Sequence, residues 1–256
     1  MTKVDVFLSA GHGGTDPGAV AYGLKEKDIN LNIMKACASE LRRHGLSVAC
    51  SRTKDENDPV SDEVREANAS GAKVAVSFHT NAGGGDGSES LHHSSNKDAK
   101  KLATLCEKYI KALGQNSRGV KVRDDLWFLR GTKMTAVLCE CAFVDNNKDN
   151  NIIDTVKEQQ KFGVAYAMAI LEYLKITYKE PVTKKEKTEK GFVVRVDITD
   201  LNIRKGPGTD YDKTGKVTGK GKFTIVNVKE GKGSKTGWGK LKSGAGWISM
   251  DYAKRV

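Results

Sequence analysis

The chain has 256 residues, of which 38% are hydrophobic and 29% are charged. This is an ordinary globular composition, long enough for one large domain or two unequal ones, and it excludes disorder throughout. No apolar run approaches the roughly 18 residues of a membrane-spanning helix. The N-terminal stretch MTKVDVFLSAGHGG does not read as a signal peptide, because Asp5 breaks its short apolar run. We therefore expect synthesis in the cytoplasm and no insertion into a membrane.

The cysteines favour the same compartment. The chain has five cysteines, an odd number, and all lie in the first 141 residues: Cys37, Cys50, Cys106, Cys139 and Cys141. None of them forms a CxxC pair. Such a set is typical of a reducing environment rather than of a disulfide scaffold or a zinc finger.

The net charge of +11 is unevenly distributed. Residues 191–256 contain 14 Lys/Arg and 6 Asp/Glu, a net of +8, and residues 179–190 add +2, which leaves +1 for residues 1–178. The basic character thus belongs to the C-terminal quarter, where a polyanionic partner is expected to bind.

Residues 1–178 alternate apolar runs with segments of helical period, which predicts an α/β domain with a mostly parallel sheet and flanking helices. Strands are expected at 4–10, 46–52, 73–80 and 136–144. Apolar residues recur at helical spacing from Ile29 to Leu41 and from Leu102 to Leu113, and a glycine follows each series. These two segments are predicted to be amphipathic helices.

The composition changes after residue 178. Residues 179–190, KEPVTKKEKTEK, hold eight charges and one aliphatic residue, which indicates a flexible linker. Residues 191–256 consist of short alternating stretches separated by glycine-rich turns, a pattern that favours a small antiparallel barrel.

Candidate chemical residues lie where the predicted strands end, which is where ligands bind in open α/β sheets. His12 follows the first strand, His79 closes the third, and Glu140 lies in the fourth, while Glu26 precedes the first helix. Two histidines and one carboxylate with an open position form a known catalytic zinc constellation, and a second carboxylate can take a proton from the attacking water.

Each residue also has a structural interpretation. His12 lies in a glycine-rich turn where a capping role is common, and His79 fits a core histidine. For Glu140 a functional role is favoured over a structural one, because burying a charged carboxylate in a strand that is covered on both faces is costly without a partner.

Five ordered segments carry a family resemblance: SAGHGGTDPGA (9–19), KEKDINLNI (25–33), REAN (65–68), VSFHTNA (76–82) and LCECAFVDN (138–146). Over residues 4–175 the chain resembles the zinc-dependent N-acetylmuramoyl-L-alanine amidases. The resemblance implies His12, Glu26 and His79 as zinc ligands and Glu140 as the catalytic carboxylate. It also implies hydrolysis of the amide between N-acetylmuramic acid and the L-alanine of the stem peptide of peptidoglycan. Asp28 lies two residues from Glu26 and competes with it for the ligand position.

Three features depart from the family pattern or stand outside the site. Cys139 and Cys141 flank the catalytic Glu, and we interpret them as small buried hydrophobes rather than as a Cys-x-Cys metal site. His92 and His93 are expected to be exposed groove residues, and Glu89 is a candidate for a Glu that the family has nearby. Arg65 and Asn68 are expected to anchor a short helix to the sheet.

The C-terminal region resembles a bacterial SH3-type (SH3b) domain from about Phe192 to Val256. The matching residues are Leu201, Asn202, Ile203, Arg204, Gly206, Pro207, Gly208, Trp238, Gly246 and Trp247. Such domains bind peptidoglycan, and the net charge of +8 suits anionic wall polymers as additional partners.

The leading hypothesis is a phage or prophage endolysin: a zinc amidase on residues 1–178, joined by the linker to a wall-binding module that targets a Gram-positive wall after release from the host cytoplasm. The alternatives are a zinc peptidase acting elsewhere on the stem peptide, and a non-catalytic protein that binds cell wall or polyanions. Nucleic acid is not an expected partner, because the basic residues form no known nucleic-acid motif.

Overall fold

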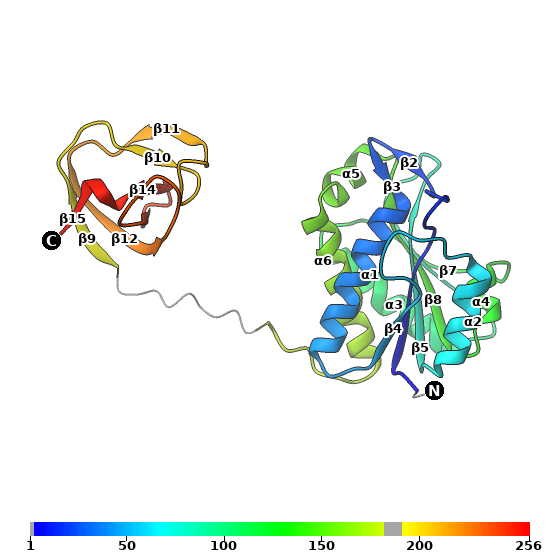
Figure 1. Ribbon diagram of the computed structural model, residues 1–256. Coiled ribbons are helices and arrows are strands. Elements are labelled where there is room, and N and C mark those ends of the chain that lie inside the picture. The colour runs from blue at the N-terminus through cyan, green and yellow to red at the C-terminus, as the bar shows by residue number, and fades with distance from the viewer. Residues whose placement is uncertain (1–2, 182–190) are drawn as a thin grey trace. The chain divides into compact units, whose positions relative to one another are not determined.

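The computed structural model describes residues 3–181 and 191–256, and the chain divides into two compact units, Met1–Lys179 and Glu180–Val256 (Figure 1). The predicted linker at 179–190 falls almost entirely outside the described residues. Each unit has its own hydrophobic core.

The first unit is built on a six-stranded mixed sheet. Its strands, in spatial order, are β4 (Val48–Cys50), β1 (Val6–Ala10), β5 (Val74–Asn81), β8 (Thr135–Phe143), β6 (Ser88–His92) and β7 (Ser117–Val122). The first four are parallel, whereas β6 runs antiparallel to β8, and β7 runs parallel to β6. The predicted mostly parallel sheet is confirmed, and all four predicted strands are present.

Helices cover both faces of this sheet. One face carries α1 (Glu26–Arg43), α3 (Lys97–Lys111) and α6 (Val156–Tyr173), and the other carries α2 (Val60–Ser70) and α4 (Trp127–Gly131). Because both faces are covered, β1 and the apolar part of β5 are buried throughout, which explains their continuous apolar sequences. The remaining elements are a short hairpin, β2 (Val20–Ala21) with β3 (Leu24–Lys25), and the helix α5 (Asn147–Ile153).

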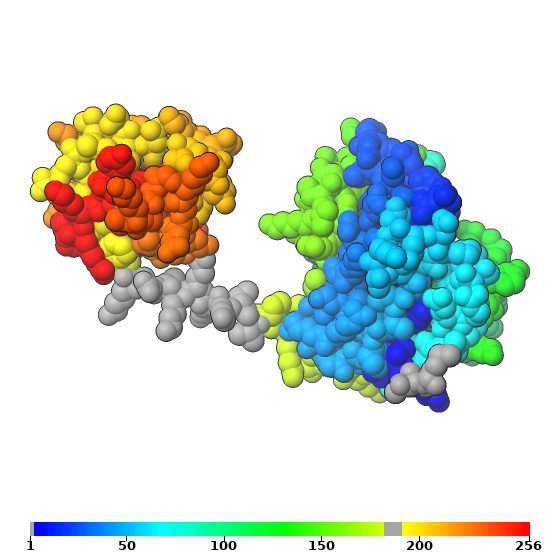
Figure 2. Space-filling model, viewed as in Figure 1, coloured from blue at the N-terminus to red at the C-terminus, as the bar shows by residue number. Residues whose placement is uncertain are grey.

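The space-filling view shows which segments form the visible surface of this unit (Figure 2). Blue-to-cyan atoms, from the first part of the chain through α2, make up most of the face turned to the viewer. The loop between β4 and α2 belongs to this surface, and it braces the turn that carries His12. The guanidinium of Arg52 donates to the carbonyl oxygens of Ala10 (3.0 Å) and Lys27 (2.7 Å).

The second unit is an all-antiparallel β sheet, as expected. Its strands are β9 (Phe192–Val196), β10 (Asn202–Arg204), β11 (Lys213–Val217), β12 (Gly221–Lys229), β13 (Trp238–Leu241), β14 (Trp247–Ser249) and β15 (Ala253–Arg255), in the spatial order β11-β10-β14-β13-β12-β9-β15. Its small core contains Val194, Ile203, Ile225, Leu241 and Ile248.

The motif residues of this unit have structural tasks. Arg204 closes the GPG turn by donating to the carbonyl oxygens of Thr209 (3.2 Å) and Tyr211 (2.7 Å). A side chain at Gly206 would clash with the Tyr211 ring, since a Cβ there would lie 2.2 Å from it. The motif residues around the GPG sequence therefore specify this turn, and Ile203 contributes to the core of the unit.

In the part of the chain that the structure describes, no helix combines the length and the apolar character needed to cross a bilayer.

Candidate active site

The first histidine lies on the glycine-rich turn after β1. His12 adopts a positive φ of 66°, a conformation that is uncommon for a residue with a side chain and that recurs at functional sites. The neighbouring glycines are needed for space. A Cβ on Gly11 would lie 2.1 Å from Cε1 of His79, and one on Gly18 would lie 2.6 Å from a carboxylate oxygen of Glu26. Gly11 and Gly18 thus let the backbone pass directly beside two of the predicted ligands.

Glu26 is the first residue of α1, where the helix dipole favours negative charge. Its side chain is buried, and its two oxygens accept hydrogen bonds from the backbone N–H groups of Ala19 (2.9 Å) and Thr80 (3.1 Å). Asn30, one turn along the helix, donates to the same carboxylate at 3.3 Å. This network holds the carboxylate in one orientation. Asp28, its competitor from the sequence, is exposed and does not join the cluster.

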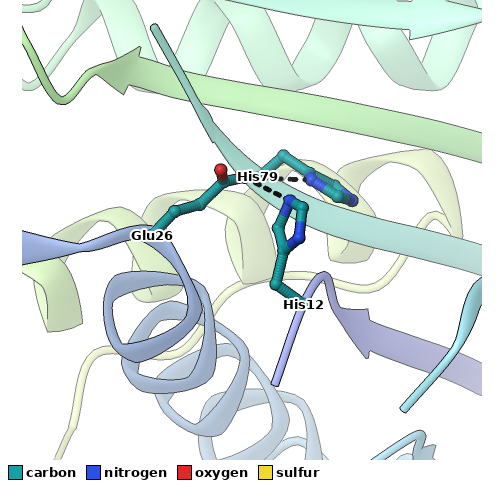
Figure 3. Close-up of side chains that lie close together, drawn as sticks. All are labelled: His12, Glu26 and His79. Atoms are coloured by element: carbon teal, nitrogen blue, oxygen red, sulfur yellow. Dashed lines mark hydrogen bonds and ion pairs between the residues drawn. The ribbon is translucent and has the colours of Figure 1, made fainter. Parts of the chain in front are cut away.

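The three predicted ligands converge (Figure 3). Oε1 of Glu26 lies 3.3 Å from Nε2 of His12 and 3.1 Å from Nδ1 of His79, and the ligand atoms of all three residues lie within 4.8 Å of one another. Two donors on one tetrahedral zinc at about 2.0–2.1 Å are separated by about 3.3–3.4 Å. The donor types and their spacing therefore fit a zinc ion.

Asp16 orients His12 from the side opposite Glu26. Its Oδ2 lies 2.7 Å from Nδ1 of His12, so that Nε2 of the ring points to the cluster. A carboxylate on the second ring nitrogen is the usual support of a metal-binding histidine, because it fixes the tautomer and raises the basicity of the ligand. Asp16 was not among the residues expected at the site, although its position four residues after a histidine in a tight turn is a signal that the sequence contains.

The charges of the cluster support one another. Burial raises the pKa of Glu26, but the hydrogen bonds from His12 and His79 outweigh burial and hold that pKa well below its usual range. The hydrogen bond to Glu26 raises the pKa of His12 to about 9. Burial lowers the pKa of His79, yet the same carboxylate outweighs it and the net shift is upward. The Glu26 carboxylate is therefore ionised and favours the protonated form of both histidines, so a metal ion that binds here would displace those protons.

Glu140 lies on β8, directly opposite His79 on β5 in the parallel register. One of its oxygens, Oε2, is buried and has no hydrogen-bond partner among residues 3–181 and 191–256. Burial raises the pKa of this carboxyl to about 7. A buried, unpaired carboxyl oxygen beside a metal cluster is available for a proton and for a substrate group that the structure does not contain.

A cavity of about 340 Å³ opens beside the two histidines. Its lining includes His12, His79, Glu63 of α2, Leu138 of β8 and the half-exposed Trp127 of α4. The cavity thus connects the metal cluster with the sheet face that α2 and α4 cover, which is the face that carries Leu138.

Cys139 and Cys141 point to the opposite face of β8. The Sγ of Cys141 contacts Oγ1 of Thr80 at 3.4 Å, and the Sγ of Cys139 contacts Oγ of Ser90 at 3.8 Å. Both thiols are fully buried. The interpretation as small core residues is confirmed, and the described residues form no Cys-x-Cys metal group.

The expectation for His92 is wrong. This residue is 5% exposed and its Nδ1 contacts the carbonyl oxygen of His93 at 2.9 Å. The physical reason is that β6 is an internal strand covered on both faces. His93 is half-buried beside Ser95, and neither histidine lines the cavity.

Asn68 anchors α2 as expected, but to the end of α4 and the segment before β8 rather than to the sheet itself. Its side-chain amide donates to the carbonyl oxygen of Gly131 at 2.9 Å and accepts from the N–H of Lys133 at 2.9 Å. The same expectation is wrong for Arg65, because its side chain is exposed and pairs with Asp62 and Glu66 of its own helix. Neither residue approaches the metal cluster.

Comparisons with known proteins agree with this geometry. The family model Amidase_3, described as N-acetylmuramoyl-L-alanine amidase, matches residues 6–172. The chain is 37% identical over 199 residues to the endolysin of Bacillus phage SPP1, covering 74% of this chain and 73% of that protein. The sporulation-specific N-acetylmuramoyl-L-alanine amidase of Bacillus subtilis is 34% identical over 168 residues, covering 64% of this chain and 66% of that protein. A solved N-acetylmuramoyl-L-alanine amidase from Clostridium difficile 630 superposes with a TM-score of 0.64 at 31% identity, covering 68% of this chain and 97% of that one.

Proposed function

The chain belongs to the Amidase_3 family of N-acetylmuramoyl-L-alanine amidases, and from that premise we propose the residues, the metal and the targeting with which it cleaves peptidoglycan. It is an endolysin-like amidase, and the bond that it cleaves is the amide between N-acetylmuramic acid and L-alanine. His12, Glu26 and His79 hold a zinc ion, and Glu140 is the general base.

A bound zinc ion supplies Lewis-acid polarisation of the scissile carbonyl and lowers the pKa of a water molecule that it contacts. The protein contributes the geometry. Asp16 and the backbone N–H groups around Glu26 keep the ligands oriented before the substrate arrives, so little reorganisation is needed at the moment of reaction.

Glu140 moves the proton. Its carboxylate accepts a proton from the attacking water as the water oxygen bonds to the carbonyl carbon. The same group then donates that proton to the alanine nitrogen as the carbon–nitrogen bond breaks. A carboxyl whose pKa lies near neutrality performs both steps well, because neither direction of transfer is strongly uphill.

One observation carries this assignment: the unpaired, buried oxygen of Glu140 lies next to three side chains whose ligand atoms converge within 4.8 Å. A purely structural carboxylate in this position would need a hydrogen-bond partner.

The second unit is assigned as an SH3b-type module that binds the wall. The assignment rests on the motif residues, on the antiparallel sheet and on the net charge of +8 over residues 191–256. Peptidoglycan is its ligand, and anionic wall polymers add to the attraction. Such a module, joined through residues 179–190, raises the concentration of the amidase unit at an insoluble substrate. Its target is a Gram-positive wall, reached when the host membrane is breached, as for an endolysin.

The test is a digest of purified Gram-positive peptidoglycan by the full chain. New L-alanine amino termini without new reducing sugars are expected. Glu140→Gln is expected to lower their rate of release by about 10²–10⁴-fold, because general-base catalysis is lost. A chelator should abolish the release, and added zinc should restore it.

Zinc content and melting temperature of Glu140→Gln serve as controls and should match those of the unmodified protein. Amino termini other than L-alanine would move the enzyme to the peptidases. Full activity of the Gln variant would remove Glu140 from the mechanism.

A further inference from the structure

The edge strand β7 contains a bulge opposite Glu89. Ser88 pairs with Ser117 but Ser90 pairs with Val120, so β7 carries one extra residue at this point. Gly119 lies within the bulge and has a φ of 85°, which a glycine adopts at little cost. In a regular strand, residues three apart point to opposite faces. The extra residue brings Arg118 and Lys121 to the same face, in the way that bulges re-aim side chains.

Both cations contact a single carboxylate. Nε of Arg118 lies 2.7 Å from Oε2 of Glu89, and Nζ of Lys121 pairs with the same oxygen. The Glu89 side chain is 10% exposed, whereas those of Arg118 and Lys121 are 38% and 42% exposed. Two positive charges on one negative charge leave a net of +1 that is open to solvent.

The Arg118 guanidinium is oriented before any ligand binds. Its Cζ lies 5.0 Å from the centre of the Phe143 ring, so the aromatic ring supports the planar group. Neither Nη atom donates a hydrogen bond to the residues that the structure describes. These atoms form a free fork of the kind that binds a carboxylate.

The cationic pair lies in line with the reacting groups. Glu140 is opposite His79 on one side and opposite Glu89 on the other, so the row continues across four neighbouring strands to β7. Strands lie about 4.8 Å apart, which places the backbone of Arg118 about 10 Å from that of Glu140. The guanidinium contacts Glu89, which is one strand from Glu140, so it lies nearer than its backbone does. An extended peptide advances about 3.3–3.6 Å per residue, so two to three residues are enough to span this separation.

We propose that Arg118 and Lys121 recognise a free carboxylate on the stem peptide, two to three residues from the scissile bond, and thereby determine which peptidoglycan the enzyme prefers. The inference rests on the proposed function and specifies its substrate. The second residue of a stem peptide is linked through its side-chain carboxyl, which leaves its α-carboxyl either free or converted to an amide. A cationic fork favours the free acid, because an amide cannot form the ion pair.

The test compares two soluble muramoyl-peptides that differ only in this group, carboxylate or carboxamide, and the readout is release of the peptide with a new L-alanine amino terminus. The unmodified protein is expected to prefer the carboxylate. Arg118→Gln is expected to lower kcat/KM on the carboxylate by about tenfold, mostly through KM, and to change it less than twofold on the amide. Arg118→Lys should retain part of the preference, and Lys121→Gln should repeat the effect of Arg118→Gln.

Lys101→Gln is the matched control, because Lys101 makes an exposed pair with Asp98 at 2.9 Å on α3, which covers the opposite face of the same sheet. It should leave both rates unchanged. Equal hydrolysis of the two substrates by the unmodified protein, or an equal loss on both in Arg118→Gln, would overturn the inference while leaving the amidase assignment intact. Failure to release a peptide with an L-alanine amino terminus from either substrate would overturn both.

Discussion

At the residue scale, the proposed metal cluster is supported by Asp16, a carboxylate that is not one of the proposed ligands. Asp16 and Glu26 contact opposite nitrogens of His12, at 2.7 Å and 3.3 Å, so the ring is held between two negative charges. The strained φ of His12 is tolerated because the turn is braced on both sides, by Arg52 at the Ala10 carbonyl and by the Lys27 ammonium at the Gly14 carbonyl, at 2.8 Å. Metal affinity is therefore a property of the whole turn.

We expect Asp16→Asn to lower zinc affinity by about 10–100-fold, because the amide cannot raise the basicity of His12 as the carboxylate does. The measurement is competition for zinc with a chromogenic chelator. Asp28→Asn is the control, since this exposed carboxylate lies two residues from Glu26 and outside the cluster. Equal affinities for the two variants would show that Asp16 has no such role.

At the scale of elements, one buried carboxylate joins α3 to the two strands at the far end of the sheet. Glu107 of α3 is 6% exposed and accepts hydrogen bonds from Ser88 (2.9 Å) and Ser90 (2.7 Å) of β6 and from Ser117 of β7. The three hydroxyl groups offset the cost of burying the charge. This contact holds β7 in place and with it the bulge that carries Arg118 and Lys121.

Glu107→Gln is expected to lower the free energy of unfolding by about 1–3 kcal/mol, because the amide accepts fewer and weaker hydrogen bonds. Urea unfolding followed by circular dichroism measures the change. In Glu172→Gln, which alters an exposed pair with Lys108 on the same helix layer, we expect a loss of about 1 kcal/mol or less. The prediction fails if the two variants are destabilised equally.

At the scale of the whole molecule, the two units differ in charge. Residues 191–256 carry a net of +8, whereas residues 1–178 carry +1. We therefore expect long-range attraction to anionic polymers to come from the second unit and to be screened by salt. Hydrolysis at the metal cluster depends on short contacts, which salt screens much less.

Binding of the full chain to Gram-positive walls is accordingly expected to weaken as sodium chloride is raised, in a sedimentation assay with inactive Glu140→Gln protein. Walls stripped of their anionic polymers should show a smaller dependence on salt. Hydrolysis of a soluble muramoyl-peptide by the unmodified protein should change little over the same range. Salt-independent binding to intact walls would assign recognition to uncharged contacts instead.

The sequence by itself determined the parallel strands, the amphipathic helices and the separate basic β unit. The reason is that burial of one or two faces of a helix or strand imposes a periodic pattern of apolar residues on its sequence. The sequence also identified His12, Glu26, His79 and Glu140 as candidates, through their places at strand ends and through the family resemblance.

Only the tertiary structure decided the rest. The strand β7 is an exposed edge strand with a glycine in its middle, so it has no alternating apolar pattern from which a strand could be predicted. His92 is buried because β6 lies inside the sheet, and Arg118 and Lys121 share a face because a bulge shifts their register. The periodicity of apolar residues indicates which face of each segment is buried. It contains no information on which strands become neighbours or on where their pairing shifts. The strand order and the shifted pairing are what bring Glu89, with Arg118 and Lys121, next to Glu140.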